Sequence, residues 1–325
     1  MTVDIVVDAW RDDEAKQENI RESLSKIVSG MIVALSLRVQ RIEGITITDR
    51  LDNALAAFDD GGLVTGRTLT RTTGDIEGVA MTPVGIRGGK AYCRVFIQAS
   101  TAEELCQNPS AAQSRYIVAH ELGHGHDLTV KSEALEPMLL KTPGDLFTPP
   151  VFWQIAEVVW NEYAACRLSA NEDPAMQQIM NAMLAMALDR IRPGTRAVIK
   201  SCIAAKTSAG ALDGVTPLVS DVLKHGSHVI GHSEGLGTSN PALGTDLLER
   251  LENVGWVSGL AEQRSILNRM WSSYEAWKDT DVFEPLLEFI KRSYKLCAVE
   301  VYAERGLAKT RFYMDLVQGI MRQPI

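Results

Sequence analysis

The chain has 325 residues, of which 46% are hydrophobic and 23% are charged, and its formal net charge at pH 7 is -8. This length allows one large or two ordinary globular domains with a sizeable hydrophobic core. The acidic balance argues against nucleic acid as the main ligand, because binding to a phosphate backbone depends on Lys and Arg.

The start of the chain and its cysteines indicate a compartment. Residues 1–30 are rich in Asp and Glu, whereas a secretion signal needs a basic start and an unbroken apolar run. No apolar run is long enough to span a bilayer, since even the Met-rich segment 176–191 is interrupted by polar residues. Five scattered cysteines without a CxxC pair are typical of reduced thiols. We therefore expect a cytoplasmic protein without a membrane span.

The N-terminal region is predicted to combine helix and sheet. Apolar residues spaced near the helical period predict a helix over 12–40. Strand-like segments follow at 44–48, 78–84 and 91–99, and the turn-forming sequence RGGK at 87–90 separates the last two. The alternation of residue types in the last segment is typical of a strand packed mainly on one face. We expect a small sheet that contains a hairpin.

A helix is predicted next, and it carries the most informative motif of the chain. Ser110 and Gln113 have the spacing of a capping box, so the helix should begin near residue 110. Gly125 is suited to end it. Four prolines between 137 and 150 then predict a loop over 127–150.

The rest of the chain is predicted to be helical. The loop expected in this part covers 231–244, which is rich in Gly, Ser, Thr and Asn. The expected helices are 151–170, 173–191, 195–207, 216–230, 245–254, 259–278, 281–304 and 308–321.

The sequence HELGH at 120–124 matches the HExxH motif of zinc enzymes. On a helix, His120 and His124 project from one face about one turn apart and can bind one cation, with Glu121 beside them. Chance would produce such a match in a chain of this composition with an expectation of roughly 0.007. The alternatives are two surface histidines that flank a glutamate, and a purely structural zinc site closed by a fourth protein ligand.

The third metal ligand has several candidates. His126 should point away on a continuing helix, and Asp127 and Val130 occupy the places where an extended motif has Gly and His. Asn240 is a poor ligand. Glu162 is favoured, because it lies on a predicted helix and the small Ala165 would allow that helix to approach the metal-binding one. An ordinary solvated carboxylate is the competing interpretation of Glu162.

HELGH followed some forty residues later by Asn-Glu-x-x-Ala resembles the gluzincin peptidases and, loosely, the ImmA/IrrE-type intracellular peptidases. The resemblance covers about fifty residues. It implies a zincin-like fold and a zinc ion held by His120, His124 and Glu162. Such families often have Asp or Asn four residues after the third ligand, where this chain has Cys166, so this position does not supply the carboxylate that would orient a ligating histidine. Asp127 is a possible substitute.

The expected fold class is α+β. A small N-terminal sheet with the motif helix, residues 1–127, would precede a large all-helical lobe, residues 128–325, that carries the third ligand. Together they would form one catalytic unit.

The six histidines of the chain fall in two short windows, and the second contains His225, His228 and His232. With Asp221 they share one face of a predicted helix. One of them, for which we select His228, could stabilise the oxyanion of the reaction. Alternatively they form a second metal site, or they only pack and cap the helix. Tyr163 is a rival oxyanion donor.

These residues predict a zinc-dependent peptidase. Glu121 would act as general base towards a metal-activated water and pass the proton to the leaving amine. The partner would be a polypeptide lying extended against a sheet edge at 78–84 or 91–99, with selection by the helical lobe. The alternatives are a non-catalytic, zinc-stabilised binding or regulatory protein and a hydrolase of non-peptide amides. The sequence does not indicate an oligomeric state.

Overall fold

The computed structural model describes residues 3–7, 14–61, 78–139, 150–208, 210–238, 243–304 and 307–322. The chain divides into two compact units. The first comprises Met1–Leu140 and Ala164–Pro174, and the second comprises Lys141–Tyr163 and Ala175–Ile325. Helix and strand occur in both, so the fold is mixed α+β with a large helical part.

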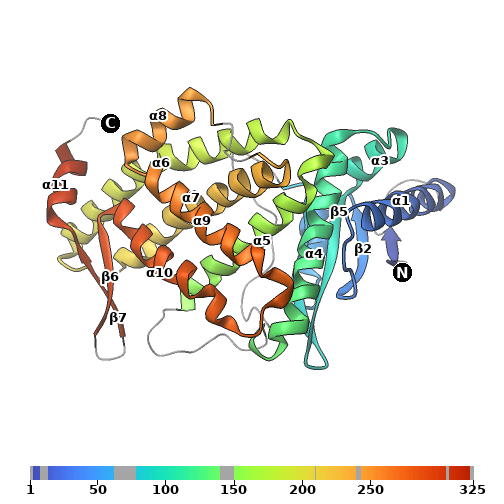
Figure 1. The fold of residues 1–325 in the computed structure, drawn as a ribbon, viewed down its shortest axis with the longest axis horizontal. Coiled ribbons are helices and arrows are strands. Elements are labelled where there is room, and N and C mark those ends of the chain that lie inside the picture. Colours follow the sequence, from blue (N-terminus) through green and yellow to red (C-terminus); the bar gives the residue numbers. More distant parts are fainter. Residues whose placement is uncertain are drawn as a thin grey trace. The chain divides into compact units, whose positions relative to one another are not determined.

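The first unit is built on a five-stranded sheet with the order β1-β2-β5-β3, in which β4 also pairs with β5. Figure 1 labels β2 and β5 of this sheet. Strands β1, β2 and β5 are parallel, whereas β3 and β4 run antiparallel to β5. Its elements are β1 (Ile5–Val7), α1 (Glu14–Ala34), β2 (Ile42–Thr48), α2 (Leu51–Ala56), β3 (Ala80–Met81), β4 (Val84–Arg87), β5 (Lys90–Gln98), α3 (Ala99–Gln107) and α4 (Ala112–Leu139).

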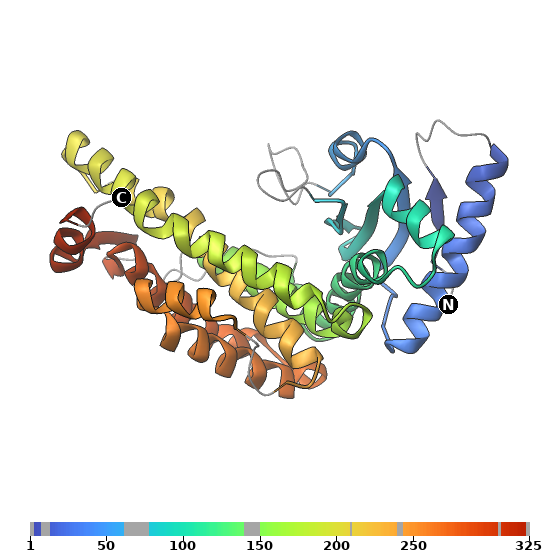
Figure 2. The ribbon, with the colours of Figure 1, turned by 90° about the horizontal axis from the view of Figure 1, so that it is seen from above.

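Strand β5 is buried on both faces of this sheet. Cys93, Val95 and Ile97 pack with helices α1, α3 and α4 in the main core. The expectation that the strand packs mainly on one face is wrong, because Tyr92 and Phe96 on the other face are buried as well. Phe96 faces the opposite side, where it packs against Leu55 of α2. Helix α1 runs alongside the strands (Figure 2). Because β5 pairs with β2 on one side and with β3 and β4 on the other, it cannot offer a sheet edge.

The β4–β5 hairpin confirms the predicted turn. Arg87 pairs with Lys90, and Gly88 and Gly89 have φ angles of 58° and 72°. Two successive positive φ angles define the tight hairpin turns whose twist matches that of the flanking strands. The expected strand 78–84 is instead divided, because Pro83, which lacks a main-chain N–H, follows β3 and precedes β4.

Two expected helix ends in the first unit are wrong. Helix α1 ends at Ala34, because Ser36 adopts a left-handed conformation with φ 54°. Helix α4 does not stop at Gly125 but continues to Leu139, through much of the expected loop. A Cβ at Gly125 would lie 2.3 Å from the Ile42 side chain. Gly125 therefore serves the close packing of α4 against the sheet rather than a helix end.

The second unit is mainly helical, and α6 and α7 pack side by side within it. Helix α5 begins in this unit and ends in the first. The further elements are α5 (Pro150–Ser169), η1 (Ala170–Glu172, in the first unit), α6 (Met176–Ala205), α7 (Ala211–Gly235), α8 (Thr245–Val254), α9 (Val257–Ser272), η2 (Tyr274–Ala276), η3 (Thr280–Phe283), α10 (Glu284–Ser293), η4 (Tyr294–Cys297), β6 (Val299–Glu304), β7 (Leu307–Phe312) and α11 (Met314–Arg322).

The C-terminal part corrects the prediction of an all-helical lobe. Strands β6 and β7 form an antiparallel hairpin where the helices 281–304 and 308–321 were expected. Ala298, with φ 54°, ends the preceding helical turn, and the alternation of Val299 and Val301 with polar residues then favours a strand. Pro193 lies inside one continuous helix α6 rather than between two helices.

Membrane-spanning helices were not expected. Among the described residues, no helix combines the length and the apolar composition that a bilayer span requires.

Candidate metal centre

Helix α4 presents His120 and His124 on one face. Their Nε2 atoms lie 3.1 Å apart, and the rings meet edge to face at 87°. Both side chains are half-buried. Residues four apart on a helix are neighbours, so the sequence spacing alone accounts for this convergence.

Glu162 completes a group of three potential metal ligands. One nitrogen of His120, one nitrogen of His124 and one carboxylate oxygen of Glu162 all lie within 4.8 Å of one another. Glu162 lies on α5, one turn before Cys166, whose Sγ is 3.7 Å from His120 Nδ1. Glu162 and Cys166 are thus neighbours on one face of α5. Among the described residues this is the only such group found.

Within the first unit, the backbones of α4 and α5 come into close contact beside the HELGH sequence. A Cβ at Gly123, inside the HELGH sequence, would lie 3.0 Å from the Cα and 3.4 Å from the Cβ of Ala165. Only glycine opposite alanine allows the helices to lie this close without displacement. The expectation that Ala165 permits a close approach is confirmed.

The donor set fits a zinc ion. Two ligands bound to zinc at about 2.0–2.1 Å with tetrahedral angles lie about 3.3 Å apart, which the two Nε2 atoms match. Two imidazoles and one carboxylate are also the set found in zinc sites that keep a coordination position open for a further ligand. The group can therefore hold a metal ion, and its donors suit zinc.

Glu121, the expected general base, is buried beside the two histidines. The Thr82 hydroxyl donates a hydrogen bond to Glu121 Oε2 at 2.6 Å. A carboxylate that accepts such a bond is held in one orientation. Thr82 follows β3, which places this contact at the edge of the sheet.

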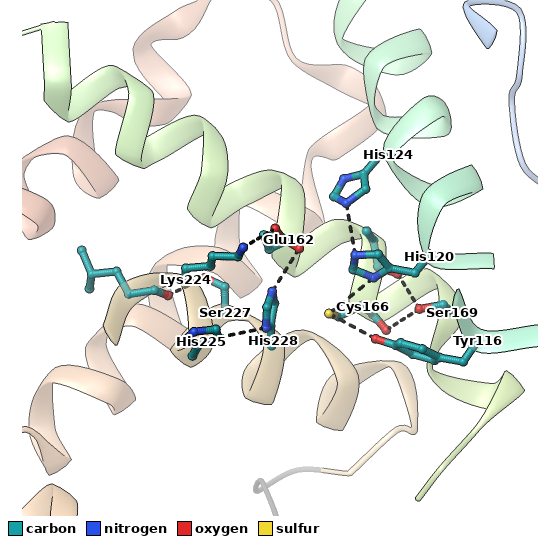
Figure 3. A network of polar contacts seen from close by, with 12 residues as sticks. Tyr116, His120, His124, Glu162, Cys166, Ser169, Lys224, His225, Ser227 and His228 are labelled. Atoms are coloured by element: carbon teal, nitrogen blue, oxygen red, sulfur yellow. Dashed lines mark hydrogen bonds and ion pairs between the residues drawn. The ribbon is translucent and has the colours of Figure 1, made fainter. Parts of the chain in front are cut away.

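The other nitrogen of His120 faces a sulfur atom. Cys166 Sγ lies 3.7 Å from His120 Nδ1 and accepts a hydrogen bond from the Tyr116 hydroxyl at 3.3 Å. Both Cys166 and Tyr116 are buried, and Figure 3 shows the side chains of His120 and Tyr116 pointing at the sulfur. The position where the resembled families often have a carboxylate is thus in contact with the histidine, but it offers a weaker acceptor.

Within the second unit, two side chains of α7 point at Glu162 (Figure 3). His228 Nε2 lies 3.0 Å from Oε2, and Lys224 Nζ lies 3.4 Å from Oε1. Behind His228, the two Nδ1 atoms of His228 and His225 are 3.3 Å apart. The predicted oxyanion donor His228 therefore contacts the presumed carboxylate ligand itself.

The environment keeps His225 uncharged. Burial lowers the pKa of His225 to about 3, and the neighbouring charges of His228 and Lys224 act in the same direction, whereas Glu162 opposes them. His225 is therefore neutral at physiological pH. Burial likewise raises the pKa of Asp221 above its usual range, against the influence of Arg190 and Lys224.

The remaining candidates have other partners. His126 Nδ1 accepts a hydrogen bond from the Arg38 main chain at 2.8 Å, and Asp127 forms a buried ion pair with Lys131 at 2.8 Å. The hydroxyl of the buried Tyr163 donates to Glu234 at 2.6 Å. These contacts support the choice of Glu162 over His126 and Asp127. Residue Asn240 lies outside the described residues.

Comparison of the chain with known protein families, curated proteins and solved structures finds no match. The likeness to gluzincins and ImmA/IrrE-type peptidases therefore rests on the two short motifs alone.

Sequence reasoning missed three contacts of this centre. They are the contacts of Thr82 with Glu121, of Tyr116 with Cys166 and of Lys224 with Glu162. In each contact the two residues are distant in the sequence. Only Lys224 carried a signal, because it lies within one turn of His225 and His228 on the same helix.

Proposed function

We propose that the protein is a zinc-dependent peptidase of the gluzincin type, with zinc bound by His120, His124 and Glu162. The observation that carries this proposal is the convergence of the three ligand atoms within 4.8 Å, next to a buried Glu121. A site with three protein ligands and an adjacent carboxylate has the parts that hydrolysis of an amide bond needs.

Each residue then has a distinct task. A zinc ion, when bound, supplies a Lewis acid that polarises the scissile carbonyl and acidifies water. Glu121 takes the proton from the attacking water and passes it to the leaving nitrogen. Thr82 holds the Glu121 carboxylate in the orientation that this transfer requires, through its hydrogen bond to Oε2.

The substrate is proposed to lie extended beside β3, in the segment 78–84. The carbonyl oxygens of Val79 and Pro83 accept hydrogen bonds from β5, at 2.8 and 3.3 Å. Since main-chain groups of successive strand residues alternate in direction, those of Ala80 and Thr82 face away from β5. A peptide strand can pair with them, and β-augmentation is a common mode of peptide binding. A cytoplasmic regulatory protein is the substrate class that we favour, by analogy with ImmA/IrrE-type peptidases.

The test is cleavage of a peptide library by wild type and Glu121→Gln. The substitution removes the base but leaves the three proposed ligands, so zinc content should stay unchanged while cleavage falls by at least about a hundredfold. Glu133→Gln, an exposed position on the same helix, is the matched control and should cleave as wild type does. Equal cleavage by wild type and Glu121→Gln would contradict the proposal. Zinc binding without any cleavage by wild type would favour a non-catalytic, zinc-stabilised protein.

A further inference from the structure

Both carboxylate oxygens of Glu162 are contacted by one helix. His228 Nε2 lies 3.0 Å from Oε2 and Lys224 Nζ lies 3.4 Å from Oε1, and both residues belong to α7. They are one turn apart, so side chains on a single face of the helix contact both oxygens of the carboxylate. All three residues lie in the second unit.

The packing of α7 against α5 determines this arrangement. A Cβ at Gly231 would lie 2.4 Å from the Tyr163 carbonyl oxygen, so the two backbones are in direct contact next to Glu162. On another side of α7, the Gln263 amide donates to the Leu223 carbonyl at 2.7 Å and to the Ser227 hydroxyl at 2.9 Å. Helix α7 is therefore held at the level of His228 by contacts that do not involve the Glu162 carboxylate.

The chemistry of the pair determines which nitrogen of His228 carries a hydrogen at the 3.0 Å contact with Glu162. An ionised carboxylate can only accept, so Nε2 of His228 must carry the hydrogen that points at Glu162. Its Nδ1 faces His225 Nδ1 at 3.3 Å, which occupies the other edge of the ring. An Nε2 atom that lies 3.0 Å from the Glu162 carboxylate is not directed at the oxyanion of a substrate. This geometry differs from the role that the sequence predicts for His228.

We propose that His228 is a positioning residue that holds the Glu162 carboxylate for the metal ion, while Lys224 competes with the metal for the same carboxylate. The proposal rests on the metal site of the proposed function. Partners that hydrogen-bond to a ligand orient it and contribute strongly to metal affinity. A nearby ammonium group instead draws on the negative charge that the metal needs.

The two contacts therefore predict opposite effects on zinc affinity. His228→Ala should weaken zinc binding by about tenfold to a hundredfold. His228→Gln should restore most of it, because the Gln amide nitrogen can take the place of Nε2, whereas the shorter Asn cannot reach. Lys224→Met should tighten zinc binding by about threefold to tenfold, because it removes the charge and keeps much of the side-chain length. Lys200→Met, at an exposed position on α6, is the matched control and should bind zinc as wild type does.

The experiment measures zinc dissociation constants of the full chain at neutral pH, by competition with a chromophoric chelator, with thermal unfolding as the check on folding. If His228→Ala does not fold, the comparison of Gln with Asn at this position decides instead. Unchanged affinity in the His228 variants would overturn the proposal, and a loss of turnover alone would restore the oxyanion role. A Lys224→Met variant that binds zinc more weakly would overturn the competing role of Lys224. Absence of zinc binding in wild type would reject the proposed function as well.

Discussion

The histidine side and the carboxylate side of the metal group are supported differently. His120 and His124 come from one turn of α4, and the contact behind His120 is the sulfur of Cys166, a weak hydrogen-bond acceptor. Glu162 is instead contacted by a histidine and a lysine of another helix, α7. The histidine pair follows from local helix geometry, whereas the carboxylate depends on packing between distant segments. Metal binding can therefore be changed by more substitutions on the carboxylate side than on the histidine side.

A substitution at the contact of Gly123 with Ala165 is expected to have the largest effect on the metal group. Gly123→Val would insert a branched side chain where even a Cβ comes within 3.0 Å of the Ala165 backbone. Overpacking of this kind costs about 1–3 kcal/mol. We expect a lower free energy of unfolding and weaker zinc binding, measured by denaturant titration and chelator competition.

The control for this change is Gly30→Ala. Gly30 lies within α1, and a Cβ there meets nothing within 4 Å. This substitution should raise the free energy of unfolding by about 0.5–1 kcal/mol, because alanine favours the helix. If Gly123→Val retains wild-type stability and zinc affinity, the close approach of α4 and α5 does not support the site.

Substitutions at Cys166 test the contact behind His120, and their expected effect on zinc binding is smaller. Cys166→Ala removes the acceptor behind His120 and should weaken zinc binding by about tenfold, whereas Cys166→Asp supplies a carboxylate and should tighten it. Cys297→Ala, at another buried cysteine, should leave zinc binding unchanged. Equal affinities of the Ala, Asp and wild-type proteins would mean that α4 alone orients His120.

Much of the centre could be predicted from sequence because its spacing is local. The HELGH spacing predicts the histidine pair, and the Asn-Glu-x-x-Ala segment led to Glu162, which the structure brings into the same group. The turn at 87–90 was equally readable, because two adjacent glycines favour positive φ angles.

What the sequence concealed depends on tertiary context. Glycine often ends a helix, but Gly125 instead allows close packing against Ile42. Helix α4 therefore continues further than expected. The hairpin β6–β7 was hidden because Val299 and its neighbours also fit a helical pattern. Thr82 could not be assigned, since a hydrogen bond between distant segments leaves no periodic trace in a single sequence.

The most direct test of the metal site is the zinc content of the purified protein and of single variants. The account predicts about one equivalent in wild type, a loss in His120→Ala, His124→Ala and Glu162→Ala, and wild-type content in His126→Ala, because His126 instead accepts a hydrogen bond from the Arg38 main chain. Undiminished zinc in Glu162→Ala would contradict the account and exclude this carboxylate as the third ligand.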